Sequence, residues 1–433
     1  MVQDHVVAQD RWLMRFGAIW LGQAASLIGS ALAHFALVWW VTETTGSATA
    51  LASAALVAML PGIVLGPFAG ALVDRWNRRL VMIVADGVVA AASAWLVLLL
   101  SQGRMQMWHV YVALVIRSLG GSFHWPAMRA STSLMVPREH LTRVAGANMA
   151  VGGIVDVAGP PLGALLMTLM PLHSIMAIDV GTALLAILPL LAVTVPQPER
   201  VGLALPAHPA GGLWADVRSG LAYVLSWQGL TALILLATVL NLLLGPALSL
   251  LPLLVTQHFG AGAPELAALQ AAWGAGIIGG GVLLGAWGGF RKRVHTILIG
   301  VVGSGVGITI LVSVPPEFLV VGLGAAVIAG LMNAMCNGAI SAVMQERVDP
   351  AMQGRVLTVL RSLAQAMMPL GLLVVGPVAD SVGVRMVILV GAAAQVLLGG
   401  AALSWGALQR LEEERPVDVA MTLSAEALEP AEG

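Results

Sequence analysis

Charged residues are scarce in this sequence. Asp, Glu, Lys and Arg together make up 10% of its 433 residues, whereas a soluble globular chain carries roughly 25%. Hydrophobic residue types reach 58%, and the mean hydropathy is +0.91. So few charges cannot cover a water-facing surface, which excludes a soluble enzyme.

Cysteine is almost absent as well. The single thiol, Cys336, excludes an internal disulfide framework and any metal site built from several cysteines. The nine histidines show no paired ligand spacing, so we expect no metal and no other cofactor. Acidic and basic residues nearly cancel, with a formal net charge of -1, and nothing indicates a nucleic-acid partner.

One glycine pattern needs a separate interpretation. Gly274, Gly276 and Gly279 match the dinucleotide-binding fingerprint G-x-G-x-x-G. That fingerprint indicates a cofactor site only where it follows a strand and opens a helix. Here it lies inside an apolar segment with no strand before it, so we interpret it as helix packing.

Long apolar runs, in contrast, are abundant. A helix that crosses the bilayer needs about 20 predominantly apolar residues, and the chain contains twelve such runs. The first is too long for a signal-peptide core, so we expect it to be retained. The runs lie at 14–41, 48–73, 80–100, 107–128, 144–168, 172–194, 229–256, 265–288, 294–314, 318–343, 355–378 and 385–408.

The positions of the 21 basic residues predict an orientation. Cytoplasmic loops of membrane proteins are enriched in Lys and Arg. With the N-terminus in the cytoplasm, seventeen basic residues fall in cytoplasmic segments, and only Arg104 and Arg385 fall in outside loops. Because twelve is even, both termini are expected to be cytoplasmic, in a multi-pass protein of the cell membrane.

The chain divides into two halves of six spans. PLGALL at 161–166 recurs as PLGLLV at 369–374. Repeated halves are typical of transporters, which bind substrate near the bilayer midplane, so we predict an all-α membrane protein with two pseudo-symmetric six-helix halves. The predicted boundaries are 1–195 for the N-terminal half, 196–228 for a cytoplasmic linker, 229–409 for the C-terminal half and 410–433 for a disordered acidic tail.

The linker contains a helical pattern of its own. Residues 213–227 are typical of an amphipathic helix. Such a helix either lies along the cytoplasmic interface or belongs to a plain connection, and the sequence leaves both open. Its predicted apolar face consists of Leu213, Trp214, Val217, Leu221 and Val224.

Five ionisable residues other than histidine remain inside the spans: Asp86, Arg117, Asp156, Asp179 and Arg361. A charge near the bilayer midplane is costly and indicates function. Arg117 and Asp156 should lie at the same depth, so Asp156 is predicted to carry a proton, contact substrate or form a static ion pair with Arg117. Asp86 and Asp179 are interpreted as structural, and Arg361 can reach the cytoplasm by extending its side chain.

Other polar residues in the spans are candidates for the wall of a substrate cavity. For the histidines the alternative is a satisfied buried side chain. Trp125 and Trp273 could line a drug pocket and are interpreted instead as core. The cavity candidates are Gln23, His34, His124, Asn241, Asn333 and Gln365.

The segment between the second and third spans resembles the loop signature of the major facilitator superfamily, G-x-x-x-D-R-x-G-R-R, with Asn77 in place of the second glycine. The resemblance implies a conformational latch. We call it the latch loop. Gly70 is expected to let two helices approach, and Asp74 to accept hydrogen bonds or pair with an arginine. Alternatively, its arginines only set topology. The latch loop consists of Gly70, Asp74, Arg75, Arg78 and Arg79.

Two further elements resemble the same superfamily. Arg117 and Gly121 match R-x-x-x-G, whose arginine is associated with proton coupling. Gly159, Pro160 and Gly163 match G-P-x-x-G, which is associated with antiporters, although Val155 stands where a further glycine is typical. Pro160 also removes a backbone donor, and the two glycines are predicted to form a close-packing face.

Longer stretches resemble the macrolide-efflux (Mef-type) transporters of this superfamily. The likeness runs from about residue 12 to 405 and implies a monomeric, proton-driven exporter of an amphipathic drug, with the proton gradient in place of a cofactor. Alternatives are export of a siderophore or another native metabolite, uptake, and a proton-independent lipid scramblase or membrane-embedded enzyme. The stretches include AIWLGQAASLIGSAL (18–32), IRSLGGSFHWPA (116–127), LLGAWGGFRKRV (283–294) and GRVLTVLRSLAQAMMPLGLL (354–373).

Overall fold

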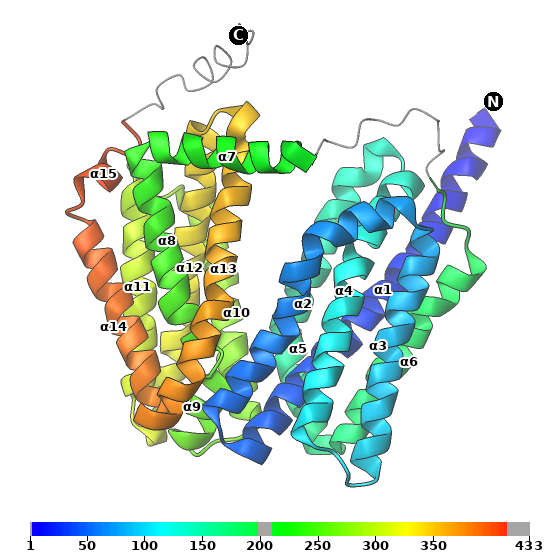
Figure 1. Ribbon diagram of the computed structural model, residues 1–433, viewed down its shortest axis with the longest axis horizontal. Helices are drawn as coiled ribbons and strands as arrows, with labels where there is room; N and C mark the ends of the chain where they lie inside the picture. Colours follow the sequence, from blue (N-terminus) through cyan, green and yellow to red (C-terminus); the bar gives the residue numbers. More distant parts are fainter. Residues whose placement is uncertain (1, 198–209, 414–433) are drawn as a thin grey trace, which may run out of the picture. The chain divides into compact units, whose positions relative to one another are not determined.

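The computed structural model of this chain describes residues 2–197 and 210–413, and regular structure in these ranges is helical, with no strand (Figure 1). The chain forms two compact units, Met1–Val201 with Ser249–Ala271, and Gly202–Leu248 with Ala272–Gly433. The α-helices are α1 (Val2–Thr45), α2 (Ala48–Arg75), α3 (Arg78–Ser101), α4 (Met107–Met135), α5 (Leu141–Leu169), α6 (Leu172–Ala192), α7 (Ala210–Ser226), α8 (Gln228–Leu248), α9 (Leu251–Gln257), α10 (Ala263–Trp287), α11 (Arg293–Ser313), α12 (Leu319–Arg347), α13 (Pro350–Val382), α14 (Val384–Ala402) and α15 (Gly406–Gln409).

Eleven helices in the described ranges are long and apolar enough to cross a membrane by length and composition. The predicted spans all fall on helices, and the span at 229–256 is divided between α8 and α9. The predicted span missing from the eleven is α4, which has 29 residues. Its polar side chains, Arg117 among them, lower its hydropathy. The structure therefore confirms an all-α, multi-pass membrane fold.

The outer surface of the first unit is apolar along α6, as expected of a surface that faces lipid. Four leucines on α6 are each more than half exposed. In water such a surface would be unfavourable, whereas in a bilayer it faces lipid tails that match it. The four are Leu184, Leu185, Leu188 and Leu191.

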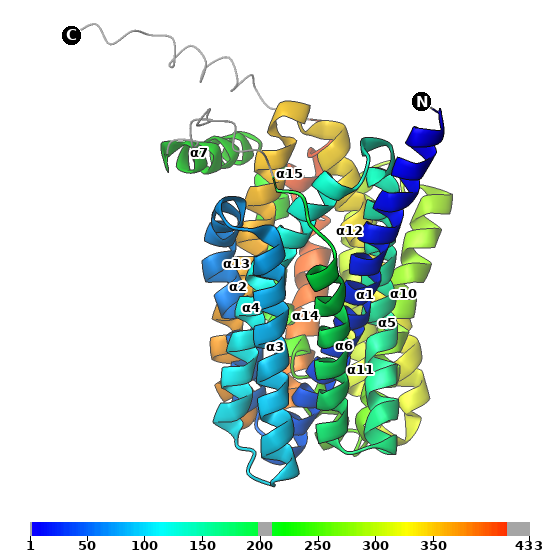
Figure 2. The same cartoon turned by 90° about the vertical axis from the view of Figure 1, so that its right-hand side faces the viewer.

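The helices of the first unit pack in the order α2, α4, α3, α6, α1 and α5, as Figures 1 and 2 show. Small residues set the closest contact. A Cβ added to Gly22 of α1 would lie 2.9 Å from the carbonyl oxygen of Leu185 on α6. Only a residue without a side chain fits there, which is the role of small residues at membrane helix interfaces.

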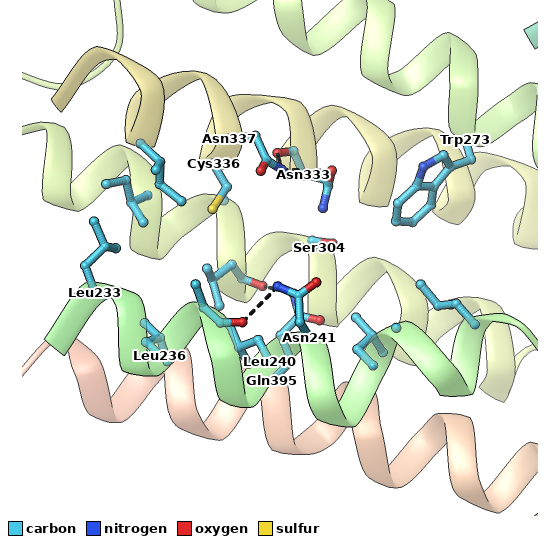
Figure 3. A pocket seen from close by; sticks show the side chains of 18 residues that line it. Leu233, Leu236, Leu240, Asn241, Trp273, Ser304, Asn333, Cys336, Asn337 and Gln395 are labelled. Atoms are coloured by element: carbon cyan, nitrogen blue, oxygen red, sulfur yellow. Dashed lines mark hydrogen bonds between the residues drawn. The ribbon is translucent and has the colours of Figure 1, made fainter. Parts of the chain in front are cut away.

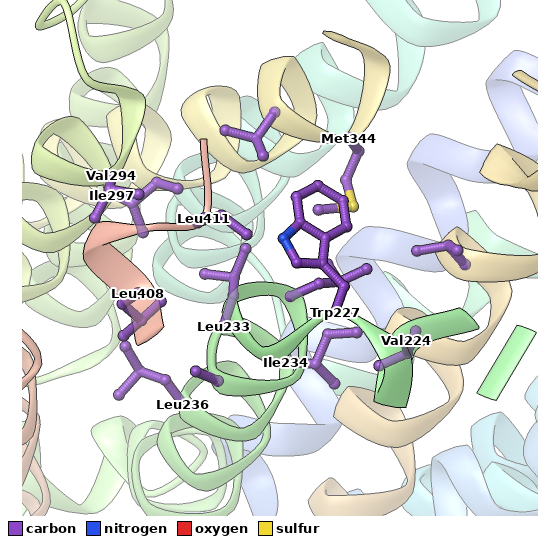
Figure 4. Close-up of a cluster of buried hydrophobic side chains, with 14 of the residues drawn as sticks. Val224, Trp227, Leu233, Ile234, Leu236, Val294, Ile297, Met344, Leu408 and Leu411 are labelled. Atoms are coloured by element: carbon purple, nitrogen blue, oxygen red, sulfur yellow. The ribbon is translucent and has the colours of Figure 1, made fainter. Parts of the chain in front are cut away.

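Helix α7 lies across the ends of α8 and α13, which it contacts (Figure 1). Val224 and Trp227 are buried at 2% and 1% exposure. They join a hydrophobic cluster with residues of α8, α11, α12 and α13 (Figure 4). The predicted helix is confirmed. Of its predicted apolar face, Val224 is buried and Leu221 is 40% exposed, and the side chains of Leu213, Trp214 and Val217 lie outside what the structure describes. The linker residues 198–209 lie outside the described ranges.

The C-terminal end of the described chain is held against α11. Leu411 is fully buried. Glu412 accepts a hydrogen bond from the backbone N–H of Val294 at 2.9 Å, and Glu413 accepts one from Lys292 at 2.9 Å. For residues 410–413 the expected disorder is therefore wrong, and the rest of the predicted tail lies outside the described ranges.

The glycine pattern in α10 serves helix packing. A Cβ added to Gly276 would lie 2.2 Å from the carbonyl oxygen of Val327 on α12, and one added to Gly280 would lie 2.4 Å from that of Leu331. The two backbones are in direct contact, so no room for a phosphate exists at Gly276. At Gly276 this confirms the interpretation as helix packing, whereas a Cβ added to Gly279 would meet no atom within 4 Å.

Candidate functional site

A buried ion pair lies in the first unit. Nη1 of Arg117 on α4 donates to Oδ2 of Asp179 on α6, and their side chains are 12% and 1% exposed. Oγ of Ser93 on α3 accepts from Arg117 at 2.7 Å and donates to the same carboxylate oxygen at 2.6 Å. Ser30 of α1 donates to the other oxygen at 3.0 Å. Four helices therefore meet at one carboxylate.

Two glycines make this meeting of helices possible. A Cβ added to Gly29 of α1 would lie 2.0 Å from Oγ1 of Thr182 and 3.3 Å from Cα of Asp179. A Cβ added to Gly120 of α4 would lie 2.7 Å from a methyl group of Val89 on α3. With larger residues the helices would separate, and short hydrogen bonds between them would be lost.

A second polar cluster lies on the same helices. Gln23 of α1 donates from Nε2 to Oδ2 of Asp86 on α3 at 2.9 Å. Nε2 of His124 on α4 lies 3.4 Å from the other oxygen of Asp86, and it has no other polar partner within the described residues. Gln23 and His124, two of the predicted cavity residues, therefore both lie against the carboxylate of Asp86, which was interpreted as structural.

The two clusters form layers. On each of three helices, the members of the two layers are seven residues apart, which is two turns or about 10 Å of helix. Since α3 and α4 are joined by a short turn and run in opposite directions, Arg117 reaches Ser93 while His124 reaches Asp86. The pairs are Gln23 and Ser30 on α1, Asp86 and Ser93 on α3, and Arg117 and His124 on α4.

Asp156 forms no ion pair with Arg117, which was one of its three predicted roles. Its side chain is exposed on α5, and it makes no side-chain hydrogen bond or ion pair within the described part of the chain. Equal depth in the membrane does not fix the direction in which a side chain points. His34 is also exposed. The side chain of Arg361 lies outside what the structure describes.

The latch loop joins α2, α3, α4 and α6. Nη2 of Arg78 lies 3.3 Å from Asp74, and its Nη1 donates to the carbonyl oxygen of Ala130 on α4 at 3.1 Å. Arg79 donates to the carbonyl oxygens of Leu190 and Leu191 at the end of α6. These two arginines therefore hold the ends of three helices together, in addition to any effect of their charge on membrane topology.

Two positions of this loop correct the sequence interpretation. A Cβ added to Gly70 would meet no atom within 4 Å, so this glycine does not bring two helices together in this conformation. Asn77, which replaces the glycine of the signature, accepts from the backbone N–H of Leu80 at 3.3 Å and caps α3. An asparagine at this position satisfies one of the free N–H groups at the start of the helix.

The glycines of α5 pack against α1. A Cβ added to Gly163 would lie 2.8 Å from the ring of Phe35, and one added to Gly159 would lie 3.3 Å from Ala31. The predicted close-packing face is confirmed, and α5 continues unbroken through Pro160. The association of this element with antiport remains a prediction.

The second unit holds a cavity of about 200 Å³ (Figure 3). Asn241 of α8 and Asn333 of α12, both predicted for a cavity wall, line it. Trp273 of α10 also lines it, although it was interpreted as core. Gln365 is exposed on α13 and is not part of the wall. Trp125 in the first unit is 51% exposed, so its assignment to the core is wrong.

The sequence did not reveal the residues that complete the ion-pair network in the first unit and the cavity wall in the second. Ser30 and Ser93 carry no signal as single residues, and neither do Ser304 and Gln395 in the second unit. The seven-residue spacing of polar residues in three spans was the available signal, because it places both members on one helix face. Among the described residues, no group of three or more His, Cys, Asp or Glu side chains is placed to hold a metal ion.

An ion pair buried among membrane-crossing helices indicates a functional membrane protein rather than a simple anchor, and the family match identifies its class as a transporter. The chain matches the model of the Major Facilitator Superfamily over residues 19–372, and it belongs to this family. It is 34% identical over 377 residues to Macrolide efflux protein A of Streptococcus pyogenes, and the aligned region covers 87% of this chain and 92% of that protein.

Other relatives extend the comparison. The chain is 29% identical over 403 residues to the Multidrug efflux pump Tap of Mycobacterium tuberculosis, covering 90% of this chain and 93% of that protein. A bacterial homologue of the iron transporter ferroportin in its inward-facing state has a TM-score of 0.67 at 14% identity, with 91% and 98% of the chains covered. The nucleoside transporter NupG has a TM-score of 0.65 at 13% identity, with coverages of 90% and 98%. These structures share the fold alone.

Proposed function

We propose that the protein exports an amphipathic, macrolide-like drug from the cytoplasm in exchange for protons, by alternating access in the cell membrane. The relatives named for macrolide and multidrug efflux support a drug substrate. The observation that carries the proton coupling is the Arg117–Asp179 ion pair, with Asp179 1% exposed inside a membrane bundle. A buried charge pair is expensive to separate, so a proton that neutralises it has a large effect.

The ion pair links protonation to helix movement. When Asp179 takes up a proton, it loses its charge, and Arg117 keeps only Ser93 and the carbonyl oxygen of Ser30 as partners. The attraction between α4 and α6 then weakens, and these helices can rearrange. When the proton leaves, the pair forms again.

Asp86 and His124 offer the next proton site. Asp86 lies nearer than Ser93 to the start of α3, the end predicted to face the cytoplasm. With water as the carrier between the two layers, a proton released by Asp179 moves about two helix turns toward that side and leaves from the Asp86–His124 pair. Asp156, exposed on α5, is then available to contact the amine of a cationic drug.

The energy of such an exchange is sufficient. A membrane potential supplies about 2.3 kcal/mol per charge per 100 mV, and about 1.4 kcal/mol corresponds to a factor of ten in concentration. For a drug exported in its uncharged form, one proton entering at ~150 mV therefore sustains a gradient of a few hundredfold. A drug exported as a cation exchanges with a proton without net charge movement, and the pH difference alone drives it.

Drug-dependent proton movement in proteoliposomes tests the proposal. With a macrolide added on one side, the wild type is expected to move protons in the opposite direction, and a protonophore should abolish drug accumulation. Asp179→Asn should abolish the proton movement while the protein still inserts. Glu317→Gln, which removes an exposed carboxylate just before the start of α12, is the control and should transport normally. Full drug-driven proton movement in Asp179→Asn would refute the coupling mechanism.

A further inference from the structure

The cavity of the second unit contains polar atoms that the protein itself does not satisfy. Ser304 of α11 is 1% exposed, and its Oγ has no hydrogen-bond partner within the described residues. Thr309 on the same helix has the usual hydrogen-bond partner, since its hydroxyl donates to the carbonyl oxygen of Gly305 at 2.8 Å. Buried hydroxyls normally have a partner, so the hydroxyl of Ser304 indicates a partner from outside the protein.

Gln395 of α14 shows the same feature. Its Nε2 donates to the carbonyl oxygen of Val301 at 2.8 Å, which fixes the orientation of the amide. Its Oε1 is buried and has no partner within the described residues, in a side chain that is 5% exposed. Two orphaned oxygens therefore belong to the wall of one cavity (Figure 3).

The asparagines of the wall add further acceptors. Nδ2 of Asn241 donates to the carbonyl oxygen of Ala237 at 2.8 Å. Nδ2 of Asn337 donates to the backbone oxygen of Asn333 at 2.9 Å. Nδ2 of Asn337 also donates to Oδ1 of Asn333 at 3.1 Å. Because an amide nitrogen carries two N–H groups, Asn241 keeps one donor beside its side-chain oxygen. The wall can therefore both accept hydrogen bonds from a hydroxyl group and donate to it.

The wall has no formal charge. Its residues include no Asp, Glu, Lys, Arg or His. An ammonium group buried there would lose its hydration without an opposite charge to replace it, which is strongly unfavourable. A hydroxyl group loses much less and forms hydrogen bonds with the oxygens described above. The chemistry therefore favours uncharged hydroxyls over a cationic amine.

The volume indicates a part of a ligand rather than a whole drug. A cavity of about 200 Å³ is smaller than the roughly 300–1,000 Å³ of drug-sized sites. Trp273 gives one end of it an aromatic surface (Figure 3). A single hydroxyl-bearing ring, polar at its edges and apolar on its faces, matches both the size and the lining.

We infer that this cavity is a subsite for the uncharged, hydroxyl-bearing part of the substrate, such as a sugar substituent, with Ser304 and Gln395 as its hydrogen-bond partners. The inference rests on the proposed export of an amphipathic drug and specifies which chemical group the second unit selects. Proton coupling is carried by Arg117 and Asp179 in the first unit, so the two roles can be measured separately.

Equilibrium binding to the purified protein in detergent, without a gradient, tests the inference. The probes are the macrolide erythromycin and its sugar-free lactone core. Because the lactone lacks the amine of the drug as well as its sugars, the deciding comparison is the effect of each variant on the two affinities. Ser304→Ala should weaken erythromycin binding roughly three- to tenfold, as expected for one lost hydrogen bond, and leave lactone binding unchanged. Without ligand it should unfold at a higher temperature, because an unsatisfied buried hydroxyl is removed.

Thr309→Val is the matched control, since it removes a satisfied hydroxyl from the same helix, and it should bind both probes as the wild type does. Equal erythromycin affinity in Ser304→Ala and wild type would overturn the subsite while leaving the export function standing. Failure of the wild type to bind either probe would count against the proposed function, and the subsite inference would fail with it.

Discussion

The carboxylate of Asp179 and the guanidinium of Arg117 face each other inside the first unit, with Oγ of Ser93 hydrogen-bonded to both. An arginine in the middle of a membrane helix is costly unless it is paired. The partner comes from α6, and the two serines complete the coordination of the carboxylate. This arrangement explains how α4, the most polar of the predicted spans, is accommodated in a membrane bundle.

Breaking this pair from one side should destabilise the protein strongly. Arg117→Ala leaves Asp179 buried without its counter-charge, which typically lowers the free energy of unfolding by roughly 3–5 kcal/mol. The double variant Arg117→Leu with Asp179→Leu removes both charges and should recover most of the loss, yet it should not transport. Thermal unfolding in detergent measures the first effect and drug export the second. An unfolding temperature unchanged in Arg117→Ala would show that the pair contributes nothing to stability.

The latch loop should separate stability from transport. Asp74 is 70% exposed, so its ion pair with Arg78 contributes at most about 1 kcal/mol to folding. Asp74→Asn should therefore unfold like the wild type but export drug poorly, because the loop can no longer reset after each cycle. Arg78→Ala, in contrast, should lower the free energy of unfolding, since it also loses the hydrogen bond to the carbonyl oxygen of Ala130.

Normal export by Asp74→Asn would contradict the latch. Glu139→Gln serves as its control, because this variant removes an exposed carboxylate between α4 and α5 that lies 3.5 Å from Nε2 of His140. It should neither lower the unfolding temperature nor slow export.

The sequence predicted the helical membrane fold well, because hydrophobic run length depends on local composition alone. It also placed Arg117, Asp86 and Asp179 at membrane depth. It did not predict which of them meet, because depth leaves the rotation of each helix open. An ion pair of Asp156 with Arg117 was one alternative based on depth, whereas the partner of Arg117 in the structure is Asp179 of α6, which lies against Gly29 of α1.

Residues that act by completing a network were the hardest to predict. Ser93 resembles any small polar residue in an apolar run, and its two bonds depend on helices that are distant in sequence. The orphaned oxygen of Gln395 is likewise visible only once the wall of the cavity has formed. In contrast, the packing role of Gly163 could be predicted, because small residues four positions apart share a helix face.

Gly163 gives a direct test of the contact between α5 and α1. In Gly163→Ala the new methyl group would lie 2.8 Å from the ring of Phe35, so one of the helices must shift. Overpacking of this kind lowers the free energy of unfolding by about 1–3 kcal/mol. Gly153→Ala on the same helix meets open space and should stabilise by up to about 1 kcal/mol through helix propensity. Unfolding in detergent compares the two, and equal effects of both variants would show that the contact does not constrain the helices.

The C-terminal segment should be held less firmly against α11 in acid. The Lys292 ammonium, which donates to Glu413, lowers the pKa of this carboxyl. A carboxylate with a lower pKa in the folded state stabilises that state above its unfolded pKa of about 4.3, and this contribution disappears as the pH falls through the folded value. Hydrogen exchange of residues 406–413, corrected for its intrinsic pH dependence, should therefore slow as the pH rises through this range in the wild type. Glu413→Gln should exchange faster at neutral pH and show no such step. Because Glu413 is exposed, the difference should be modest and should shrink in high salt.

Lys292→Met should match Glu413→Gln at neutral pH, since either change removes the same ion pair. Wild-type protection in both variants would show that the buried side chain of Leu411 alone holds the segment in place.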